Sequence, residues 1–222
     1  MNGMSAPLRI VAHRAANDLA TLVAAPTVAD VAEADVHLFL GRLEVRHEKT
    51  IGPLPILWER WYLVRRPRLL LQDLLPVVPP GIDLILDLKG PDPRLPRAVL
   101  DAATGWLSAR RLIVSSRVWR HLDVLRHRAG ISTFYSVGSS RQLSSLLRRY
   151  GPDGIPGVCV HRRLLAAAVC AALRERSSEL WTWPVDDPED AVMLAGWGVT
   201  GLISDRPELL RPGLTALRPG VV

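Results

Sequence analysis

The chain has 222 residues, of which 48% are hydrophobic and 23% charged, as is typical of a globular protein with a sizeable core. No apolar run approaches the roughly 18 residues that a membrane helix needs, and the segment from Met1 to Arg9 lacks the hydrophobic core of a secretory signal. The net charge of +6 favours anionic partners, but the sequence has no zinc finger, no basic arm and no aromatic–basic RNA motif, so we expect no nucleic acid partner.

The two cysteines, Cys159 and Cys170, lie in apolar sequence and lack metal-ligand spacing. A reduced protein of the cytoplasm is the simplest interpretation. We expect one domain over residues 1–222, and the sequence does not specify an oligomeric state.

Short apolar strands alternate with helices along the chain, a pattern that predicts a parallel sheet. We expect strands at residues 8–13, 31–40, 82–88, 112–115, 131–135, 157–160, 179–183 and 199–204. We expect helices at residues 17–25, 69–75, 95–108, 118–128, 139–150, 163–176 and 188–195. The proline-rich tail, residues 207–222, is expected to pack loosely.

In the second predicted strand, apolar and ionisable residues alternate, so that Glu33, Asp35 and His37 share one face. Gly41 and Arg42 predict a tight turn into a short return strand at residues 43–47. Two interpretations stay open for the acidic face. In one, the strand is covered on both sides and a divalent metal neutralises the carboxylates; in the other, it is an edge hairpin with its acids in solvent.

Eight strand–helix units predict an α/β fold, specifically a compact (β/α)8 barrel with a short β-hairpin after the second strand. A doubly wound open sheet is the alternative. The first strand–helix turn, Ala12 to Leu19, contains no glycine, so the sequence carries no dinucleotide fingerprint there.

Polar residues cluster where the predicted strands end, which in such barrels is where active sites lie. Three carboxylates, several histidines, an arginine and a lysine are expected to converge on one rim. The residues are His13, Arg14, Glu33, Asp35, Asp87, Lys89, Ser115, Ser116, His161, Trp183, Asp205 and Arg206.

These motifs resemble, in order, those of the glycerophosphodiester phosphodiesterase family. Residues 10–14 resemble its opening His-Arg-Gly, residues 33–36 its Glu-x-Asp-Val, and residues 44–48 the His-Asp that ends its hairpin. Residues 86–89 resemble Leu-Glu-x-Lys, residues 183–186 Trp-Thr-Val-Asn, and residues 201–207 the closing Gly-Ile-x-Thr-Asp-Arg-Pro. The chain departs from the family at Ala15 (for glycine), Glu48 (for aspartate) and Asp87 (for glutamate), and its segment after His47 is shorter than the family's insertion.

The resemblance implies a (β/α)8 phosphoric diester hydrolase that splits a small glycerophosphodiester into an alcohol and glycerol 3-phosphate. His13 and His47 would form the general acid–base pair. Glu33, Asp35 and Asp87 would hold one divalent cation, Mg²⁺ or Ca²⁺, because all the ligands are oxygen. Arg14 and Lys89 would contact the phosphate, and Trp183 would wall the alcohol pocket.

Structural roles compete with several of these assignments. Either catalytic histidine could be a hydrogen-bonded structural residue, and Asp87 could simply pair with Lys89. Asp205 is expected to pair with Arg206 or a backbone amide, outside the chemistry. His121 and His127 are expected on a surface helix.

Two other functions are weighed against the diesterase. A phospholipase-like enzyme acting on a lipid phosphodiester would use the basic charge and the tryptophans Trp58 and Trp61 for weak contact with a membrane surface. A catalytically impaired barrel that binds a phosphorylated ligand would account for the departures at Ala15, Glu48 and Asp87.

Overall fold

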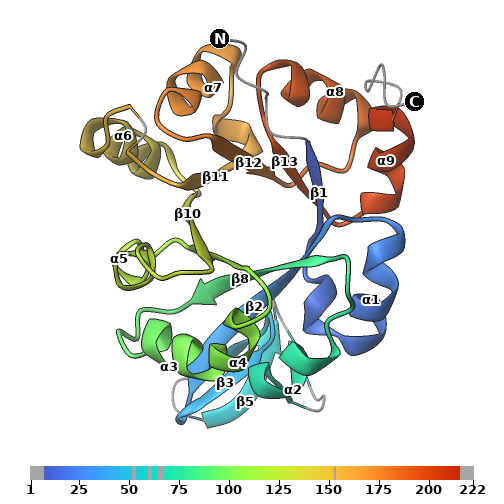
Figure 1. Cartoon of the computed structure of the whole chain (residues 1–222), viewed down its shortest axis with the longest axis vertical. Coiled ribbons are helices and arrows are strands. Elements are labelled where there is room, and N and C mark those ends of the chain that lie inside the picture. Colours follow the sequence, from blue (N-terminus) through green and yellow to red (C-terminus); the bar gives the residue numbers. More distant parts are fainter. Residues whose placement is uncertain (1–7, 52–53, 60–61, 65–67, 153, 216–222) are drawn as a thin grey trace.

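Eight parallel strands close into a barrel in the computed structural model, which describes residues 8–51, 54–59, 62–64, 68–152 and 154–215 (Figure 1). The strands are paired in the order β1-β13-β12-β11-β10-β9-β8-β2, and β1 pairs with β2 to close the ring. Their bounds are β1 Arg9–Ala12, β2 Val31–Phe39, β8 Asp83–Lys89, β9 Leu112–Ser116, β10 Ile131–Val137, β11 Gly157–His161, β12 Glu179–Trp183 and β13 Gly201–Ser204. The predicted (β/α)8 fold is confirmed.

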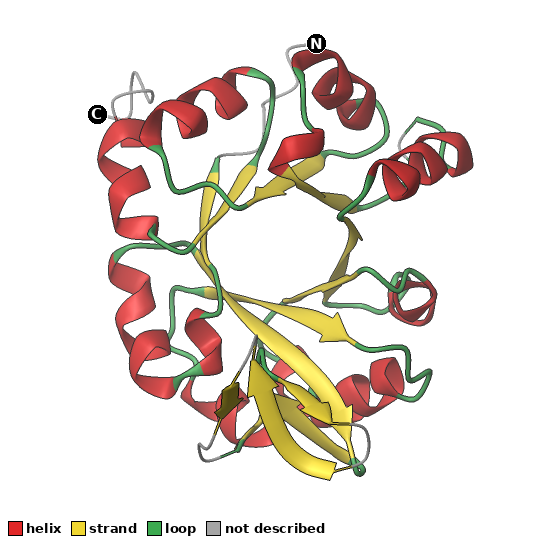
Figure 2. Ribbon diagram, turned by 180° about the vertical axis from the view of Figure 1, so that it is seen from behind, coloured by secondary structure: helices red, strands yellow, loops and turns green. Residues whose placement is uncertain are grey.

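The helices lie outside the ring of strands (Figure 2). They are α1 Leu19–Ala24, α2 Leu71–Leu74, α3 Leu95–Ala102, α4 Thr104–Leu107, α5 Arg120–Leu125, α6 Ser140–Arg149, α7 Ala167–Arg174, α8 Pro188–Gly196 and α9 Pro207–Thr215. Short 3₁₀ turns span Ala15–Asn17, Ala25–Thr27, Leu75–Val77 and Arg162–Leu164. None of the described helices has the length and apolar character to cross a membrane.

The barrel interior is filled by one apolar side chain from each strand: Val11, Val31, Ile85, Ile113, Phe134, Cys159, Trp181 and Ile203. Phe134 and Trp181 are the bulkiest of these, with ring centroids 4.5 Å apart. Two glycines make room for them. A Cβ at Gly157 would lie 2.7 Å from Phe134, and one at Gly201 would lie 2.5 Å from Trp181. The interior is therefore a packed layer that forms the floor of anything bound above it.

The predicted hairpin is present but extends into structure that was not predicted. Strand β3, Arg42–Val45, returns antiparallel to β2 and pairs with β7, Leu69–Leu70. A separate sheet follows, formed by β4 Lys49–Ile51, β5 Leu54–Glu59 and β6 Tyr62–Val64. No strand was predicted in this proline-rich segment. Pro55 lies where the β4–β5 pairing shifts register, between the pairs Thr50–Leu57 and Ile51–Leu54.

The prediction of a loosely packed tail is wrong for residues 207–215, which form α9. Pro207 opens this helix, where its fixed φ fits the first turn. Leu210 is fully buried, the helix packs on α8, and Arg211 pairs with Asp30 at 3.1 Å. Residues 216–222 lie outside the described residues.

Three predicted helices also differ in the structure. The one at residues 69–75 begins as strand β7, so that α2 covers only Leu71–Leu74. The one at residues 95–108 is divided into α3 and α4 at Ala103, and the one at residues 163–176 begins with a 3₁₀ turn before α7. The two cysteines are free and buried, as predicted. The cytoplasmic location stays a prediction.

Candidate active site

The candidate site is the layer of side chains directly above the apolar floor. Successive inward-facing residues of a strand are two apart, so each floor residue is followed two positions later by a residue of the next layer. That layer comprises His13, Glu33, Asp87, Ser115, Ser136, His161, Trp183 and Asp205. All eight line one cavity of about 320 Å³ at the C-terminal ends of the strands, as do Arg14, His47 and Lys89. Of the twelve residues predicted to converge on one rim, nine line this cavity, and Asp35 is buried beside Glu33 and Asp87. Ser116 is instead buried, with its hydroxyl donating to the backbone oxygen of Leu88, and Arg206 is exposed and does not line the cavity.

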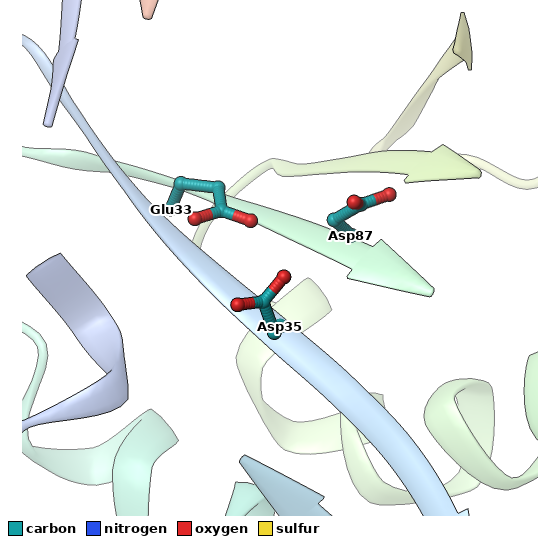
Figure 3. A group of neighbouring side chains, drawn as sticks. All are labelled: Glu33, Asp35 and Asp87. Atoms are coloured by element: carbon teal, nitrogen blue, oxygen red, sulfur yellow. The ribbon is translucent and has the colours of Figure 1, made fainter. Parts of the chain in front are cut away.

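Three carboxylates meet beside this cavity (Figure 3). Glu33 and Asp35 project from β2 and Asp87 from β8, and each offers an oxygen within 4.8 Å of the others. Glu33 and Asp35 are buried, so strand two is covered on both faces and is not an exposed edge hairpin. Asp87 reaches the group although it is one methylene shorter than the glutamate of the family motif, and Ser115 Oγ donates to it at 2.9 Å.

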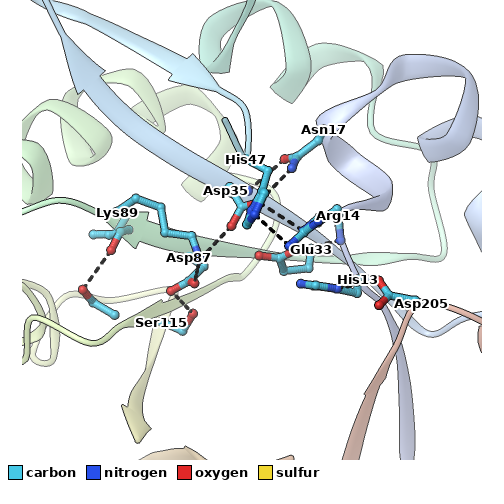
Figure 4. Close-up of polar contacts among 12 residues, drawn as sticks. His13, Arg14, Asn17, Glu33, Asp35, His47, Asp87, Lys89, Ser115 and Asp205 are labelled. Atoms are coloured by element: carbon cyan, nitrogen blue, oxygen red, sulfur yellow. Dashed lines mark hydrogen bonds and ion pairs between the residues drawn. The ribbon is translucent and has the colours of Figure 1, made fainter. Parts of the chain in front are cut away.

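Asp35 is the most constrained of the three acids. Asn17 donates from Nδ2 to its carboxylate at 2.9 Å and accepts its backbone N–H at 2.9 Å (Figure 4). Burial alone would raise the pKa of Asp35, but the hydrogen bond from His47 and the charge of Lys89 outweigh it, and the pKa is lowered. Asp35 is therefore an anion with a fixed orientation.

Lys89 supplies positive charge at the centre of the cluster. Its Nζ lies 2.7 Å from Asp35 Oδ1 and also contacts Asp87 Oδ2. Burial opposes its charge, but Asp87, Asp35 and Glu33 together raise the pKa of Lys89. Asp87 therefore both pairs with Lys89 and belongs to the carboxylate cluster, so the two interpretations of Asp87 do not exclude each other.

One lysine does not neutralise three acids. Burial and the charge of Asp35 raise the pKa of Glu33 well above its ordinary value. A cluster of oxygen donors with this excess negative charge fits a hard divalent cation, which takes carboxylate and water ligands. Glu33, Asp35 and Asp87 are the residues that would hold it.

Arg14 links the acids to His47. Its backbone is in the left-handed region, with φ 55°, which costs a residue with a Cβ about 1 kcal/mol or more. This conformation directs its N–H to Glu33 Oε2 at 2.7 Å. Its guanidinium lies 2.9 Å from His47 Nε2, and His47 Nδ1 lies 3.2 Å from Asp35 Oδ2. Because arginine only donates, Nε2 of His47 accepts and Nδ1 donates to Asp35.

His13 has an acidic partner that the sequence reasoning missed. Its Nδ1 lies 2.6 Å from Asp205 Oδ1, and Figure 4 shows the two side chains together. The hydrogen bond from His13 lowers the pKa of Asp205. The expected pairing of Asp205 with Arg206 or a backbone amide is therefore wrong. Adjacent strands β1 and β13 bring the two residues together, so closure of the barrel was the signal that could have identified the pair.

The remaining predicted residues divide into rim and core. Trp183 lies at the rim, with its ring centroid 5.7 Å from that of His161. His37 shares the inward face of β2, and burial together with Arg46 lowers its pKa to about 4. His121 was expected at the surface but is buried, with burial lowering its pKa. Trp61 lies outside the described residues.

No protein-family model and no curated protein sequence matches this chain. Solved structures do match. An Oleispira antarctica phosphodiesterase, in complex with the product sn-glycerol-3-phosphate, superposes with a TM-score of 0.75 at 17% identity, over 95% of this chain and 97% of that chain.

Two further structures are similar over nearly the whole chain. A glycerophosphodiester phosphodiesterase from Parabacteroides distasonis has a TM-score of 0.75 at 21% identity, covering 96% of this chain and 99% of that chain. The enzyme from Thermotoga maritima has a TM-score of 0.69 at 19% identity, covering 95% and 98%. These matches establish that nearly the whole chain has the fold of these phosphodiesterases.

Proposed function

We propose that the protein is a metal-dependent phosphodiesterase that hydrolyses glycerophosphodiesters to an alcohol and glycerol 3-phosphate. The observation that carries the proposal is a cluster of three carboxylates beside a cavity that is lined by histidines, arginines and a lysine, in a barrel with this fold. Each part of phosphodiester hydrolysis has a residue suited to it, and the similarity to solved phosphodiesterases supports the assignment.

The phosphate group would bind between Arg14 and Lys89, whose side chains line the cavity beside the carboxylates. The guanidinium of Arg14 offers a fork of donors, and Lys89 offers a point charge. A divalent cation held by Glu33, Asp35 and Asp87, Mg²⁺ or Ca²⁺, would supply further neutralisation of the charge that develops on the phosphoryl oxygens.

His13 is the better candidate for the general base. Its Nδ1 proton is held by Asp205, which leaves the lone pair of Nε2 available. In the proposed first step His13 takes the proton of the glycerol 2-hydroxyl, whose oxygen bonds to phosphorus as the bond to the alcohol oxygen breaks. For His47 to act as the acid, Arg14 would turn from His47 Nε2 to the phosphate, and Nε2 would carry a second ring proton. His47 then gives that proton to the departing oxygen while its Nδ1–H stays on Asp35. Water then opens the cyclic phosphate with the roles of the histidines reversed, and glycerol 3-phosphate results.

The test is product analysis by ³¹P NMR after incubation of the purified protein with glycerophosphocholine, with Mg²⁺, with Ca²⁺ or with a chelator. The proposal predicts cation-dependent formation of glycerol 3-phosphate, with a cyclic phosphate detectable early. Formation of phosphocholine instead would place the cleavage on the other side of phosphorus and contradict the proposed chemistry. Binding of glycerol 3-phosphate without turnover of any diester would favour the impaired barrel.

A second candidate is supported by one surface. Leu54, Ile56 and Trp58 alternate along β5 and are exposed, and Leu63 pairs with Trp58 on the same face. Lys49, opposite Trp58, lines a cavity next to the candidate site. An apolar face beside a cation suits a lipid surface, so a lipid phosphodiester is the alternative substrate. Sedimentation with anionic phospholipid vesicles that is reduced by Trp58→Ser would support this alternative, whereas a protein that stays in the supernatant would exclude it.

A further inference from the structure

A second cavity, of about 580 Å³, adjoins the first. The two share His47, Asp87, Lys89 and Arg117 as a common wall. Beyond that wall the second cavity is lined by residues of β2, β4 and β8 and of the turns after β8 and β9: His37, Lys49, Thr50, Leu88, Gly90 and Val118. A phosphodiester has two arms, and the paired cavities offer a place for each.

The first cavity suits the glycerol arm. His13 and Glu33 line it and do not line the second, so the hydroxyl that attacks phosphorus must lie there. The alcohol arm then extends past His47, the proposed acid, into the second cavity.

The charge of the second cavity is positive. Its only carboxylate among the described lining residues is Asp87, which already belongs to the carboxylate cluster and contacts Lys89. Lys49 and Arg117 are exposed, and the described residues provide neither side chain with an ion-pair partner. The described lining also contains no Trp, Tyr or Phe that could enclose a quaternary ammonium.

Arg117 is held in place without being neutralised. Its guanidinium carbon lies 5.7 Å from the centroid of the Trp183 ring. It also lies against Gly138, where a Cβ would be only 3.1 Å from the same carbon. An arginine positioned by packing alone keeps its donors for a ligand.

We infer that the second cavity binds the alcohol moiety of the substrate through Lys49 and Arg117 and selects alcohols that carry a phosphate or carboxylate group over neutral and cationic ones. The inference rests on the function proposed above. Two cations that face one cavity would attract an anion and repel an ammonium group, so glycerophosphocholine would be among the poorer substrates.

The experiment compares three diesters: glycerophosphoglycerol, the same compound with a terminal phosphate, and glycerophosphocholine. We expect the highest kcat/KM for the terminal phosphate. The Lys49→Met variant loses one charge-assisted hydrogen bond to the terminal phosphate. The ratio of kcat/KM for the phosphate-bearing diester to kcat/KM for glycerophosphoglycerol should therefore fall about tenfold. Lys49→Glu should shift the preference toward glycerophosphocholine. The control Arg42→Met removes an exposed cation that lines neither cavity and should leave the ratios unchanged.

Binding separates this inference from the proposed function. Calorimetry with the His13→Ala variant should give the same order of affinities with no turnover. Equal affinities for the three diesters, or an order that Lys49→Met does not change, would overturn the inference while leaving the hydrolase intact. Ordered affinities without hydrolysis by the wild type would instead overturn the proposed function.

Discussion

Asp205 offers the sharpest test of how the site is organised, because the proposed chemistry assigns it an effect only through His13. Asp205→Asn preserves the size of the side chain and removes its negative charge. The oxygen it presents to His13 Nδ1 lies at 2.6 Å, a short contact that indicates a charge-assisted hydrogen bond.

The expected loss of rate in Asp205→Asn follows from the strength of this hydrogen bond and from the exposure of the Asp205 side chain. A hydrogen bond to a charged group contributes about 1.5–3 kcal/mol when buried, but the Asp205 side chain is 57% exposed, so solvent screens it. About 1–1.5 kcal/mol remains, which corresponds to a loss of roughly tenfold in rate. Because Asp205 positions a base and is not proposed to touch the substrate, the loss should fall on kcat and leave KM nearly unchanged.

The assay is steady-state hydrolysis of a glycerophosphodiester by wild type and variant at saturating cation. Asp101→Asn is a matched control, since Asp101 pairs with Arg97 on α3 and lines neither cavity of the site. Asp205→Glu should recover part of the activity. An Asp205→Asn enzyme with the wild-type kcat would show that the contact does not orient the base, and the assignment of His13 would have to be revised.

Two predictions concern stability. Gly201→Ala should lower the free energy of unfolding in urea by about 1–3 kcal/mol, because the new Cβ would lie 2.5 Å from Trp181, whereas Gly196→Ala, with nothing within 4 Å, should be neutral or stabilising. Equal stability of the two variants would mean that the barrel interior is not filled as described. Stability should also fall as the pH drops below about 6.5, because the lowered pKa of buried His121 leaves the unfolded chain binding more protons. His121→Leu should reduce that slope by up to about 1.4 kcal/mol per pH unit, and a slope equally reduced by His127→Leu, which changes an exposed residue, would contradict the assignment.

The barrel and most of the site follow from local patterns. The alternation of Glu33, Asp35 and His37 with apolar residues fixed which side chains share a face, since the period of a strand is two. The same spacing placed Asp87 and Lys89 together on β8. The local pattern did not show whether that face is buried or exposed to solvent. In the structure Asp35 is fully buried, so the face lies in the interior.

The features that were missed depend on contacts distant in sequence. Asp205 meets His13 across 192 positions, through the pairing of the first and last barrel strands. The helix α9 is stabilised by burial of Leu210 and by the Arg211–Asp30 pair. Neither contact can be predicted from the proline-rich sequence of the tail. In both cases tertiary packing, not local propensity, decides the outcome.

The sheet of β4, β5 and β6 was missed for a different reason. Proline is unfavourable in the middle strand of a sheet, but position 55 lies outside both sets of paired residues. The β4–β5 pairing shifts register there, and the β5–β6 pairing covers only Leu57 to Glu59. A sequence does not reveal where a strand will shift register. This sheet supplies Lys49 to the second cavity, so the part of the fold that local pattern did not predict also contributes to the inferred substrate preference.

Whether the carboxylate cluster is a metal site is decided by the initial rate of glycerol 3-phosphate release as Mg²⁺ or Ca²⁺ is titrated into metal-free protein. It would be made on the wild type, His13→Ala, Glu33→Gln and the control Glu189→Gln, which alters an exposed carboxylate on α8. We predict saturable cation-dependent release by the wild type and the control, no release by His13→Ala, and for Glu33→Gln a loss of rate with weakened cation dependence. Release by wild type that does not depend on a cation, or a Glu33→Gln variant that titrates like the wild type, would contradict the assignment of the carboxylate cluster as the metal site.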